Sequence, residues 1–339
     1  MKVLILGSIG SYSGPSNVHS AFLKHWPAQD DIDYVHALDR FGFIREGLSK
    51  GHHADVVISP LLSCPCICTQ DALHAMGKPI VCFNHGYVVF ENEINNLGLP
   101  RWWIRCYKSA LRSADYVVAN SQLQGDFVRR YQPELADRIG HILLGADRFE
   151  RMEPHPAEDG PIVTVSGGSR YIKGNDIVAR ACSLINKRGA GCRLDVYGTV
   201  EGDMSFLSAL PKDESRALGQ VDHDRFLEAL NQSSLFVMNS RHEPFGLSAL
   251  DAIQSGTSLL ISKNCGVLEV LRPESSDVIQ NCEDPVEVAD KMEYVLAHPN
   301  GKRLYESLDW NELSWDTQVG RLRQMCVEVV ERKRESGVR

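Results

Sequence analysis

The stretch SSLFVMNSRHEPFGLSALDAIQSGTSLLIS, residues 233–262, holds two short apolar runs separated by a sharp turn and a helical pattern. The runs SSLFVMN and TSLLIS are apolar on both faces, which is typical of central strands in a parallel sheet. Pro244 and Gly246 predict the turn, and a helix is expected to begin between Phe245 and Ser248. The strand–helix–strand order predicts an α/β fold.

The same order recurs along the chain in two series. The first-half runs are 2–7, 54–59, 78–84, 114–120 and, more weakly, 141–145, and the second-half runs are 161–168, 192–198, 233–239 and 257–262. Strands that alternate with helices in two series predict two Rossmann-like, doubly wound parallel sheets. Ligands of such sheets bind beyond the carboxyl ends of the strands, so we expect a cleft lined by loops of both domains.

The length of 339 residues suits two domains better than one. Residues 148–161 are polar, carry three prolines and lack an apolar period, which indicates a linker. We therefore expect an N-terminal Rossmann-like domain over 1–148, a linker over 149–161 and a second Rossmann-like domain over 162–316. A C-terminal helix over 317–339 is expected to pack back on the first domain.

Composition excludes several classes of protein. Hydrophobic residues make up 43% and charged residues 24%, as in soluble globular proteins, and the net charge of −8 argues against nucleic-acid binding. The sequence contains no run of about 20 apolar residues that could span a membrane, and no secretory signal is visible. We therefore expect a cytosolic protein with reduced thiols. Cys64, Cys66 and Cys68 lack the second pair that zinc sites use, and no metal site is predicted.

Three loops carry candidate binding residues. The first, GSIGSYSGPSN (7–17), follows the opening strand, and Gly10, Ser13 and Gly14 allow close backbone approach to an anion or a sugar. It is not a dinucleotide fingerprint, and an ordinary strand-to-helix turn explains it equally well.

The second loop, SGGSRYIKGND (166–176), follows the first strand of the second domain. Gly168 frees the backbone, and Arg170 and Lys173 place two cations where a helix begins. Such a loop suits a diphosphate, whose charge needs neutralisation. The alternative is a solvated basic turn.

The third loop is the turn of the opening stretch. Gly246 and Leu247 begin a helix whose unpaired N–H groups bind phosphate oxygens, with Phe245 beside them. Glu243 precedes the helix and is predicted to accept hydrogen bonds from sugar hydroxyls, while Asp251 is predicted to hold a ribose diol. The alternative is that both acids are capping or surface residues.

These segments resemble the GT-B fold glycosyltransferases, specifically the retaining family 4 type, also called glycosyl transferases group 1. EPFGLSALD is similar to the family's Glu-x7-Glu signature, with Asp251 where the second Glu usually stands. Lys173-Gly174 matches the end of the family's Gly-Arg-x4-Lys-Gly segment, although the Arg position holds Gly168 and Arg170 is displaced by two residues.

The resemblance extends over nearly the whole chain. Residues 110–128, 252–271 and 313–319 resemble the family's segments before the linker, after the signature helix and at the last helices. In the family a His in the region of 83–93 faces the donor sugar, which makes His85 the candidate.

The resemblance implies transfer of a sugar from a nucleotide diphosphate sugar to an acceptor hydroxyl with retention, without a cofactor or a metal, in polysaccharide or cell-envelope glycan synthesis. The domain over 1–148 would be the acceptor side, and the domain over 162–316 would bind the nucleotide sugar. Glu243, His85 and Lys173 would be the catalytic residues. A sugar-nucleotide epimerase of GT-B type, or a silent nucleotide-sugar-binding subunit, stay open as alternatives. The donor base, the sugar and the oligomeric state do not follow from the sequence.

Residues 100–112, PRWWIRCYKSALR, mix aromatic and basic side chains. This surface would make a weak peripheral contact with the inner face of a membrane, and it favours a lipid-linked saccharide as the acceptor. A core-packed helix with a solvated basic face is the competing interpretation.

Overall fold

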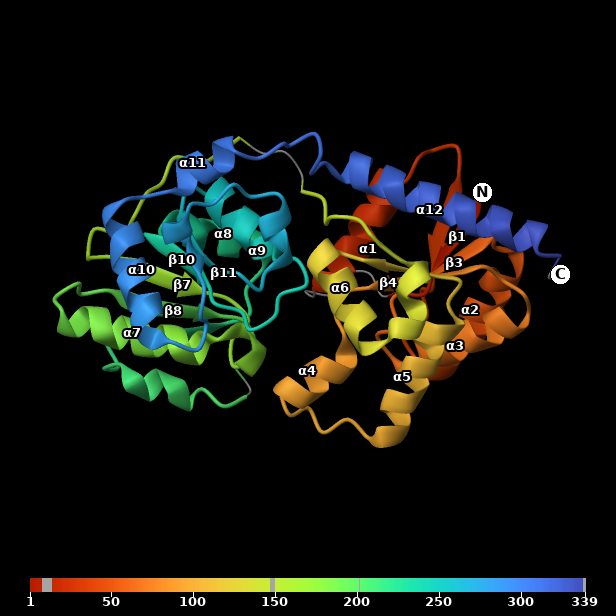
Figure 1. Cartoon of the computed structure of the whole chain (residues 1–339), viewed down its shortest axis with the longest axis horizontal. Helices are drawn as coiled ribbons and strands as arrows, with labels where there is room; N and C mark the ends of the chain where they lie inside the picture. Colours follow the sequence, from red (N-terminus) through yellow and green to blue (C-terminus); the bar gives the residue numbers. More distant parts are fainter. Residues whose placement is uncertain (8–13, 147–149, 201, 338–339) are drawn as a thin grey trace. The chain divides into compact units, whose positions relative to one another are not determined.

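The computed structural model describes all residues except 8–13, 147–149, 201 and 338–339, so the predicted loop residues Gly10 and Ser13 lie outside the described part. The chain divides into two compact units (Figure 1). Unit 1 comprises Met1–Asp147 and Trp310–Arg339, and unit 2 comprises Arg148–Asp309.

Unit 1 contains a six-stranded parallel sheet with the order β2-β1-β3-β4-β5-β6. Its strands are β1 (Lys2–Ile5), β2 (Asp31–Tyr34), β3 (Val56–Ser59), β4 (Ile80–Asn84), β5 (Tyr116–Ala119) and β6 (Ile139–His141). Four predicted runs contain a strand, whereas the run at 141–145 begins where β6 ends. The sequence gives no apolar run for β2 because this edge strand, DIDY, alternates polar and apolar residues.

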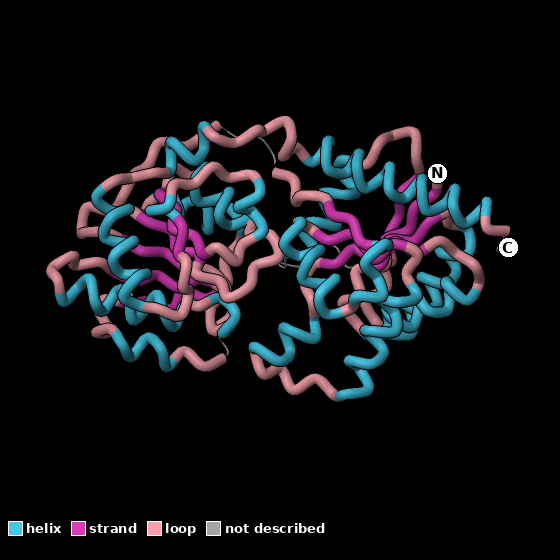
Figure 2. The backbone as a smooth tube through the Cα atoms, viewed as in Figure 1, coloured by secondary structure: helices cyan, strands magenta, loops and turns pink. Residues whose placement is uncertain are grey.

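Helices cover both faces of this sheet, as Figure 2 shows. They are α1 (Gly14–His25), α2 (Arg40–His53), α3 (Cys64–Ala75), α4 (Val88–Ile94), α5 (Arg101–Ser113), α6 (Gln122–Tyr131), the 3-10 helix η1 (Pro133–Arg138) and α12 (Trp315–Glu335). The side chains of Asp39, Ser63 and Ser121 cap α2, α3 and α6.

The C-terminal helix α12 belongs to unit 1. Arg323 bonds to Asp30 at 2.6 Å and Lys333 bonds to Asp115 at 2.8 Å. These pairs tie the last helix to residues about 220 to 290 positions earlier in the chain. The helix begins two residues before the predicted 317 because Ser314 caps it.

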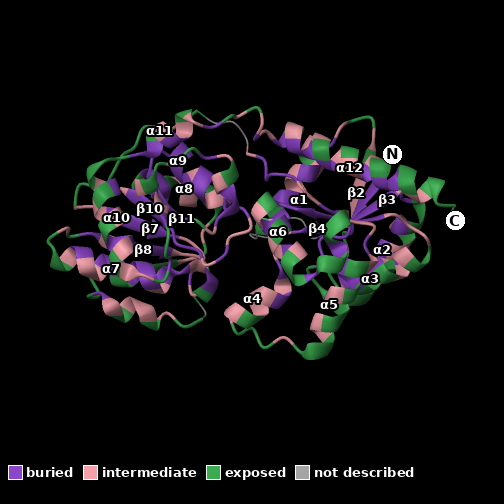
Figure 3. Cartoon of the chain, viewed as in Figure 1, coloured by how far each residue is buried: buried purple, intermediate pink, exposed green. Residues whose placement is uncertain are grey.

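Unit 2 contains a second six-stranded parallel sheet with the order β12-β11-β10-β7-β8-β9. Its strands are β7 (Ile162–Val165), β8 (Arg193–Tyr197), β9 (Ser215–Gly219), β10 (Leu235–Met238), β11 (Ser258–Ser262) and β12 (Val278–Ile279). The four central strands lie within the predicted runs, and the edge strands β9 and β12 are additional. The inner strands of both sheets are buried (Figure 3).

The helices of unit 2 alternate with these strands. They are η2 (Tyr171–Lys173), α7 (Asn175–Lys187), η3 (Ser205–Ala209), α8 (His223–Asn231), α9 (Leu247–Gln254), η4 (Gly266–Glu269), η5 (Ser275–Asp277), α10 (Pro285–Ala297) and α11 (Gly301–Glu306). The segment predicted as a linker is bound to this unit, since Met152 N–H donates to Gln254 O at 2.8 Å and His155 N–H donates to Asn231 O at 3.1 Å.

The strand orders locate a ligand site in each unit. In unit 2 the chain runs outward in one direction from β7 and in the other from β10, so the order reverses between these two neighbours. In unit 1 the corresponding reversal lies between β1 and β3. Open α/β sheets bind ligands outside the carboxyl ends of the strands at such a switch point.

Candidate functional site in unit 2

The loop after β7 requires glycine at three positions. Gly167, Gly168 and Gly174 have φ values of 89°, 58° and 66°. A Cβ on Gly168 would lie 1.9 Å from the carbonyl oxygen of Thr199, and a Cβ on Gly174 would lie 2.2 Å from that of Asn239. The loop is therefore held close against the backbone that follows the neighbouring strands, at the switch point.

Lys173 and Glu243 meet at this switch point. The Lys173 stem crosses Gly167, where a Cβ would lie 2.5 Å from Lys173 Cγ. Its Nζ donates to Glu243 Oε2 at 2.5 Å, and the two side chains are 19% and 13% exposed. Two predicted site residues that are 70 positions apart thus form one charge-assisted hydrogen bond.

Arg241 holds the turn that carries Lys173. Its guanidinium, 6% exposed, bonds to Asp176 at 2.9 Å and to Glu283 at 2.6 Å, and it lies 3.6 Å from the centre of the Tyr171 ring. Burial alone would lower the pKa of Arg241, but the bonds to Asp176 and Glu283 outweigh burial and raise it. No sequence motif indicates this residue, because its partners come from two distant segments, 171–176 and 283.

The turn after β10 leaves the start of α9 without a side-chain cap. Gly246 has a φ of 108° and provides the N-cap, so no side chain caps the helix. Phe245 is 1% exposed and anchors the turn in the interior of unit 2, and its carbonyl oxygen accepts from Val267 N–H at 2.8 Å. The first N–H groups of a helix have no intrahelical partner, so Leu247 N–H is suited to bind an anion.

Asp251 interacts with a residue that sequence analysis missed. His223 Nε2 lies 3.3 Å from Asp251 Oδ1, and this hydrogen bond raises the pKa of His223 although burial opposes it. His223 is the first residue of α8, and Asp251 is the fifth of the eight residues of α9. Asp251 and Glu243 therefore have separate partners.

Two further residues shape the glycine loop. Arg170 is exposed and immediately precedes η2, whose last residue is Lys173. Asn175, which follows Gly174, donates through its side-chain amide to the carbonyl oxygens of Ser166 at 3.1 Å and Gly168 at 2.9 Å. This amide fixes the loop backbone. The only clue to the role of Asn175 in the sequence is its position directly after Gly174.

Unit 1 places His85 at the carboxyl end of β4, next to a second histidine. His85 Nε2 lies 3.0 Å from Nε2 of His19, which is fully buried in α1. Burial, with His19 as a further cause, holds the pKa of His85 well below its ordinary value. A Cβ on Gly7 would lie 2.5 Å from the His19 ring, so Gly7 makes room for the pair. Gly14 is the first residue of α1.

No group of three or more His, Cys, Asp or Glu side chains suited to a metal ion occurs in the described part of the chain. Within the same residues, every helix is too short or too polar to cross a membrane.

Comparisons with known proteins agree with this geometry. Residues 147–309 match the family Glycosyl transferases group 1, and residues 15–148 match Glycosyltransferase Family 4. D-inositol 3-phosphate glycosyltransferase of Salinispora tropica is 26% identical over 75% of this chain and 60% of its own length. Glycogen synthase of Mycobacterium tuberculosis is 30% identical over 60% of this chain and 53% of its own length. The chain thus spans less than two thirds of these relatives.

Solved structures share the fold. Sucrose-phosphate synthase of Thermosynechococcus elongatus superposes with a TM-score of 0.75 at 16% identity, covering 97% of this chain and 98% of its own. Anabaena HepE in complex with UDP-glucose gives a TM-score of 0.72 at 14% identity, covering 98% and 99%. Both sheets and both family matches lead to one conclusion: this chain belongs to the GT-B glycosyltransferases, with a family 4 first half and a group 1 second half.

Proposed function

We propose that this protein transfers a sugar from a nucleotide diphosphate sugar to an acceptor hydroxyl. The observation that carries the proposal is the Lys173–Glu243 pair, 2.5 Å apart, at the switch point of unit 2 beside the uncapped start of α9. The names of the relatives, a glycogen synthase and inositol phosphate glycosyltransferases, support it, as does the UDP-glucose complex of HepE.

Each part of the donor has a candidate partner. Lys173, with Arg170, and the Leu247 N–H would neutralise the diphosphate. Glu243 would accept hydrogen bonds from the sugar hydroxyls, and Asp251, oriented by His223, would hold the ribose diol. The glycine loop lets the backbone approach the phosphates, since Gly168 offers no side chain to obstruct them.

The chemistry depends mainly on the leaving group. The bond between the anomeric carbon and the diphosphate oxygen breaks, and negative charge accumulates on that oxygen. Lys173 and the α9 amide stabilise this charge, which is usually the largest catalytic contribution. The acceptor oxygen attacks the same face and its proton passes to the departing phosphate oxygen, so the configuration is retained without a metal. We assign His85 a contact with the transferred sugar.

The product would be a polysaccharide or a glycolipid of the cell envelope, and the reaction would take place in the cytoplasm. Helix α5 supports contact with the inner membrane face, because Arg101, Arg105 and Arg112 are exposed and Trp102 is 59% exposed on it.

Incubation with radiolabelled UDP-, GDP- and ADP-sugars tests the proposal, with and without a mixed lipid and saccharide acceptor fraction. Transfer predicts label in an acceptor and release of one nucleoside diphosphate per bond formed. An isomerised sugar nucleotide without acceptor would identify an epimerase, and binding without any product would identify a silent subunit. NMR of the new anomeric centre and a parallel reaction in EDTA test retention and metal independence.

A further inference from the structure

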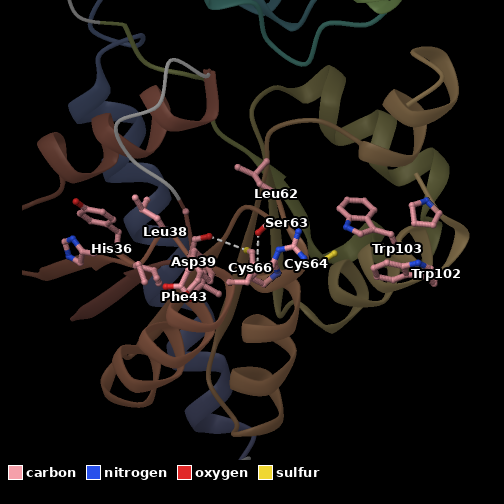
Figure 4. A pocket seen from close by; sticks show the side chains of 18 residues that line it. His36, Leu38, Asp39, Phe43, Leu62, Ser63, Cys64, Cys66, Trp102 and Trp103 are labelled. Carbon is pink, nitrogen blue, oxygen red and sulfur yellow. Dashed lines mark hydrogen bonds between the residues drawn. The ribbon is translucent and has the colours of Figure 1, made fainter. Parts of the chain in front are cut away.

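Unit 1 contains a pocket of about 810 Å³ that the donor chemistry does not use (Figure 4). It lies beyond the carboxyl ends of β1, β2 and β3, which include the switch point of this sheet, and extends to the start of α5. Its lining is mainly apolar and includes Leu6, Leu38, Phe43, Leu62, Trp102 and Trp103. Its volume suits a small molecule or one part of a larger one.

Most polar side chains of the lining already have partners in the fold. Asp39 accepts from the N–H of Gly42 at 2.8 Å and caps α2, while Ser63 caps α3. His36 Nε2 lies 3.2 Å from Asp33. The walls therefore offer a ligand apolar contact more than hydrogen bonds, unlike a pocket built for an unsubstituted sugar.

The rim of the pocket exposes large apolar side chains to solvent. Leu38 is 99% exposed, Trp102 is 59% exposed and Leu62 is 43% exposed. Leu61, which is buried, has a φ of 53°, a conformation that leucine rarely adopts. Residues with unusual backbone conformations cluster at ligand sites, and exposed apolar patches mark binding surfaces.

One arginine lines this pocket and two more belong to the helix that reaches it, although the whole chain carries a net charge of −8. Arg40 lines the pocket, and Arg101 lies between the lining residues Pro100 and Trp102. Arg105 follows one helical turn later. All three arginines are exposed, and none forms an ion pair within the described part of the chain. Their charge complements an anionic group attached to an apolar chain.

We propose that this pocket binds the alkyl or isoprenyl chain of a single lipid phosphate molecule, with Arg40, Arg101 and Arg105 meeting its phosphate. The assignment of this amphiphile as the sugar acceptor rests on the proposed transferase activity, whereas the binding itself does not. The pocket thus selects the class of acceptor, an anionic lipid carrier rather than a free saccharide.

Calorimetric titration with hexyl, octyl and decyl phosphate, each below its micelle concentration, tests the proposal on the full chain. Burial of each added methylene predicts about a fourfold gain in affinity until the pocket is filled. Alkyl glucosides of the same chain lengths should bind roughly 10-fold or more weakly, and inorganic phosphate should not bind measurably. In Arg101→Gln/Arg105→Gln the preference for the phosphate should fall, with the chain-length dependence retained.

Leu38→Ser/Leu62→Ser should flatten the chain-length dependence, whereas Leu97→Ser, a change at a leucine that is 53% exposed and does not line the pocket, should leave it intact. Affinity independent of chain length, or equally reduced in both variants, would overturn the proposal. Binding to anionic vesicles but not to monomers would overturn it too, and would assign this surface to membrane contact.

The two proposals fail separately. Lys173→Met should bind decyl phosphate with unchanged affinity, and Leu38→Ser/Leu62→Ser should still be stabilised by a nucleoside diphosphate. If the protein bound the alkyl phosphates as expected but bound no sugar nucleotide, the proposed transferase activity would be wrong. The proposed binding of a lipid phosphate in the pocket would still stand.

Discussion

Lys173→Met and Glu243→Gln should have opposite effects on the binding of a nucleoside diphosphate. In the structure the Lys173 ammonium is hydrogen-bonded to the Glu243 carboxylate at 2.5 Å. A diphosphate bound to the same ammonium would gain from the lysine charge and would be repelled by the carboxylate. The intact pair cannot reveal these two contributions, but single substitutions separate them.

The magnitudes follow from the contact. A hydrogen bond to a charged group contributes about 1.5–3 kcal/mol, so Lys173→Met should weaken diphosphate binding by about 10- to 150-fold. A phosphate bridged to Glu243 through Lys173 would lie roughly 5 Å from the carboxylate, where like charges repel by about 1–3 kcal/mol. Glu243→Gln should therefore bind the diphosphate at least as tightly as the parent protein does.

The sugar reverses this outcome for Glu243. If Glu243 accepts hydrogen bonds from the sugar, Glu243→Gln should lower turnover of the nucleotide sugar by about 10- to 150-fold. Lys173→Met should lower turnover by about 100- to 1000-fold, because the lysine ammonium that stabilises the leaving group is lost. Both losses should exceed any change that results from altered folding.

Thermal-shift titration with UDP, GDP and ADP identifies the preferred base, and calorimetry then gives the affinities. Lys173→Met/Glu243→Gln is the control, since it removes both charges and should restore folding stability lost when Lys173→Met leaves a carboxylate unpaired. If Glu243→Gln weakened diphosphate binding as much as Lys173→Met does, the pair would stabilise the fold and would not bind the ligand.

Three other substitutions, one of them with a matched control, test the surroundings of the pair. Gly168→Ala should cost about 3 kcal/mol or more of unfolding free energy because its Cβ would lie 1.9 Å from a carbonyl oxygen, whereas Gly191→Ala, at a similar φ of 61° with open space, should cost about 1–2 kcal/mol in urea unfolding. Burial lowers the pKa of His242 from 6.5 to about 4, so the folded state binds this proton less readily than the unfolded state does. The free energy of unfolding should therefore fall by up to about 3 kcal/mol as the pH falls from 6.5 to 4. His242→Gln should lose less unfolding free energy over that range in the same urea assay. Arg241→Met should free the turn before Lys173 and weaken diphosphate binding in calorimetry by roughly tenfold, and unchanged affinity would show that Arg241 does not position Lys173.

The sequence reveals the parts of the site that depend on local chemistry. Apolar runs identify the central strands because burial on both faces removes polar residues from them. The glycines of 166–174 and the Pro244–Gly246 turn are visible because backbone geometry restricts these positions to few residue types. Edge strands such as β2 escape this signal, since one side of each strand faces solvent.

Contacts between distant segments leave no local pattern. His19 and His85 are 66 positions apart, and Arg241 bonds to a residue 65 positions away, so neither pairing follows from periodicity. The unit 1 pocket is similar, because it is lined by the ends of three strands and the start of α5. The aromatic and basic residues of 100–112 were evident in the sequence, but their position beside Leu38 and Leu62 was not.

A crystal structure with the preferred sugar nucleotide tests the central claim most directly. We predict that the diphosphate lies within hydrogen-bonding distance of Lys173 Nζ and of Leu247 N–H, and that a sugar hydroxyl donates to Glu243. A diphosphate bound away from the carboxyl ends of β7 and β10, with the Lys173–Glu243 pair undisturbed, would contradict the account.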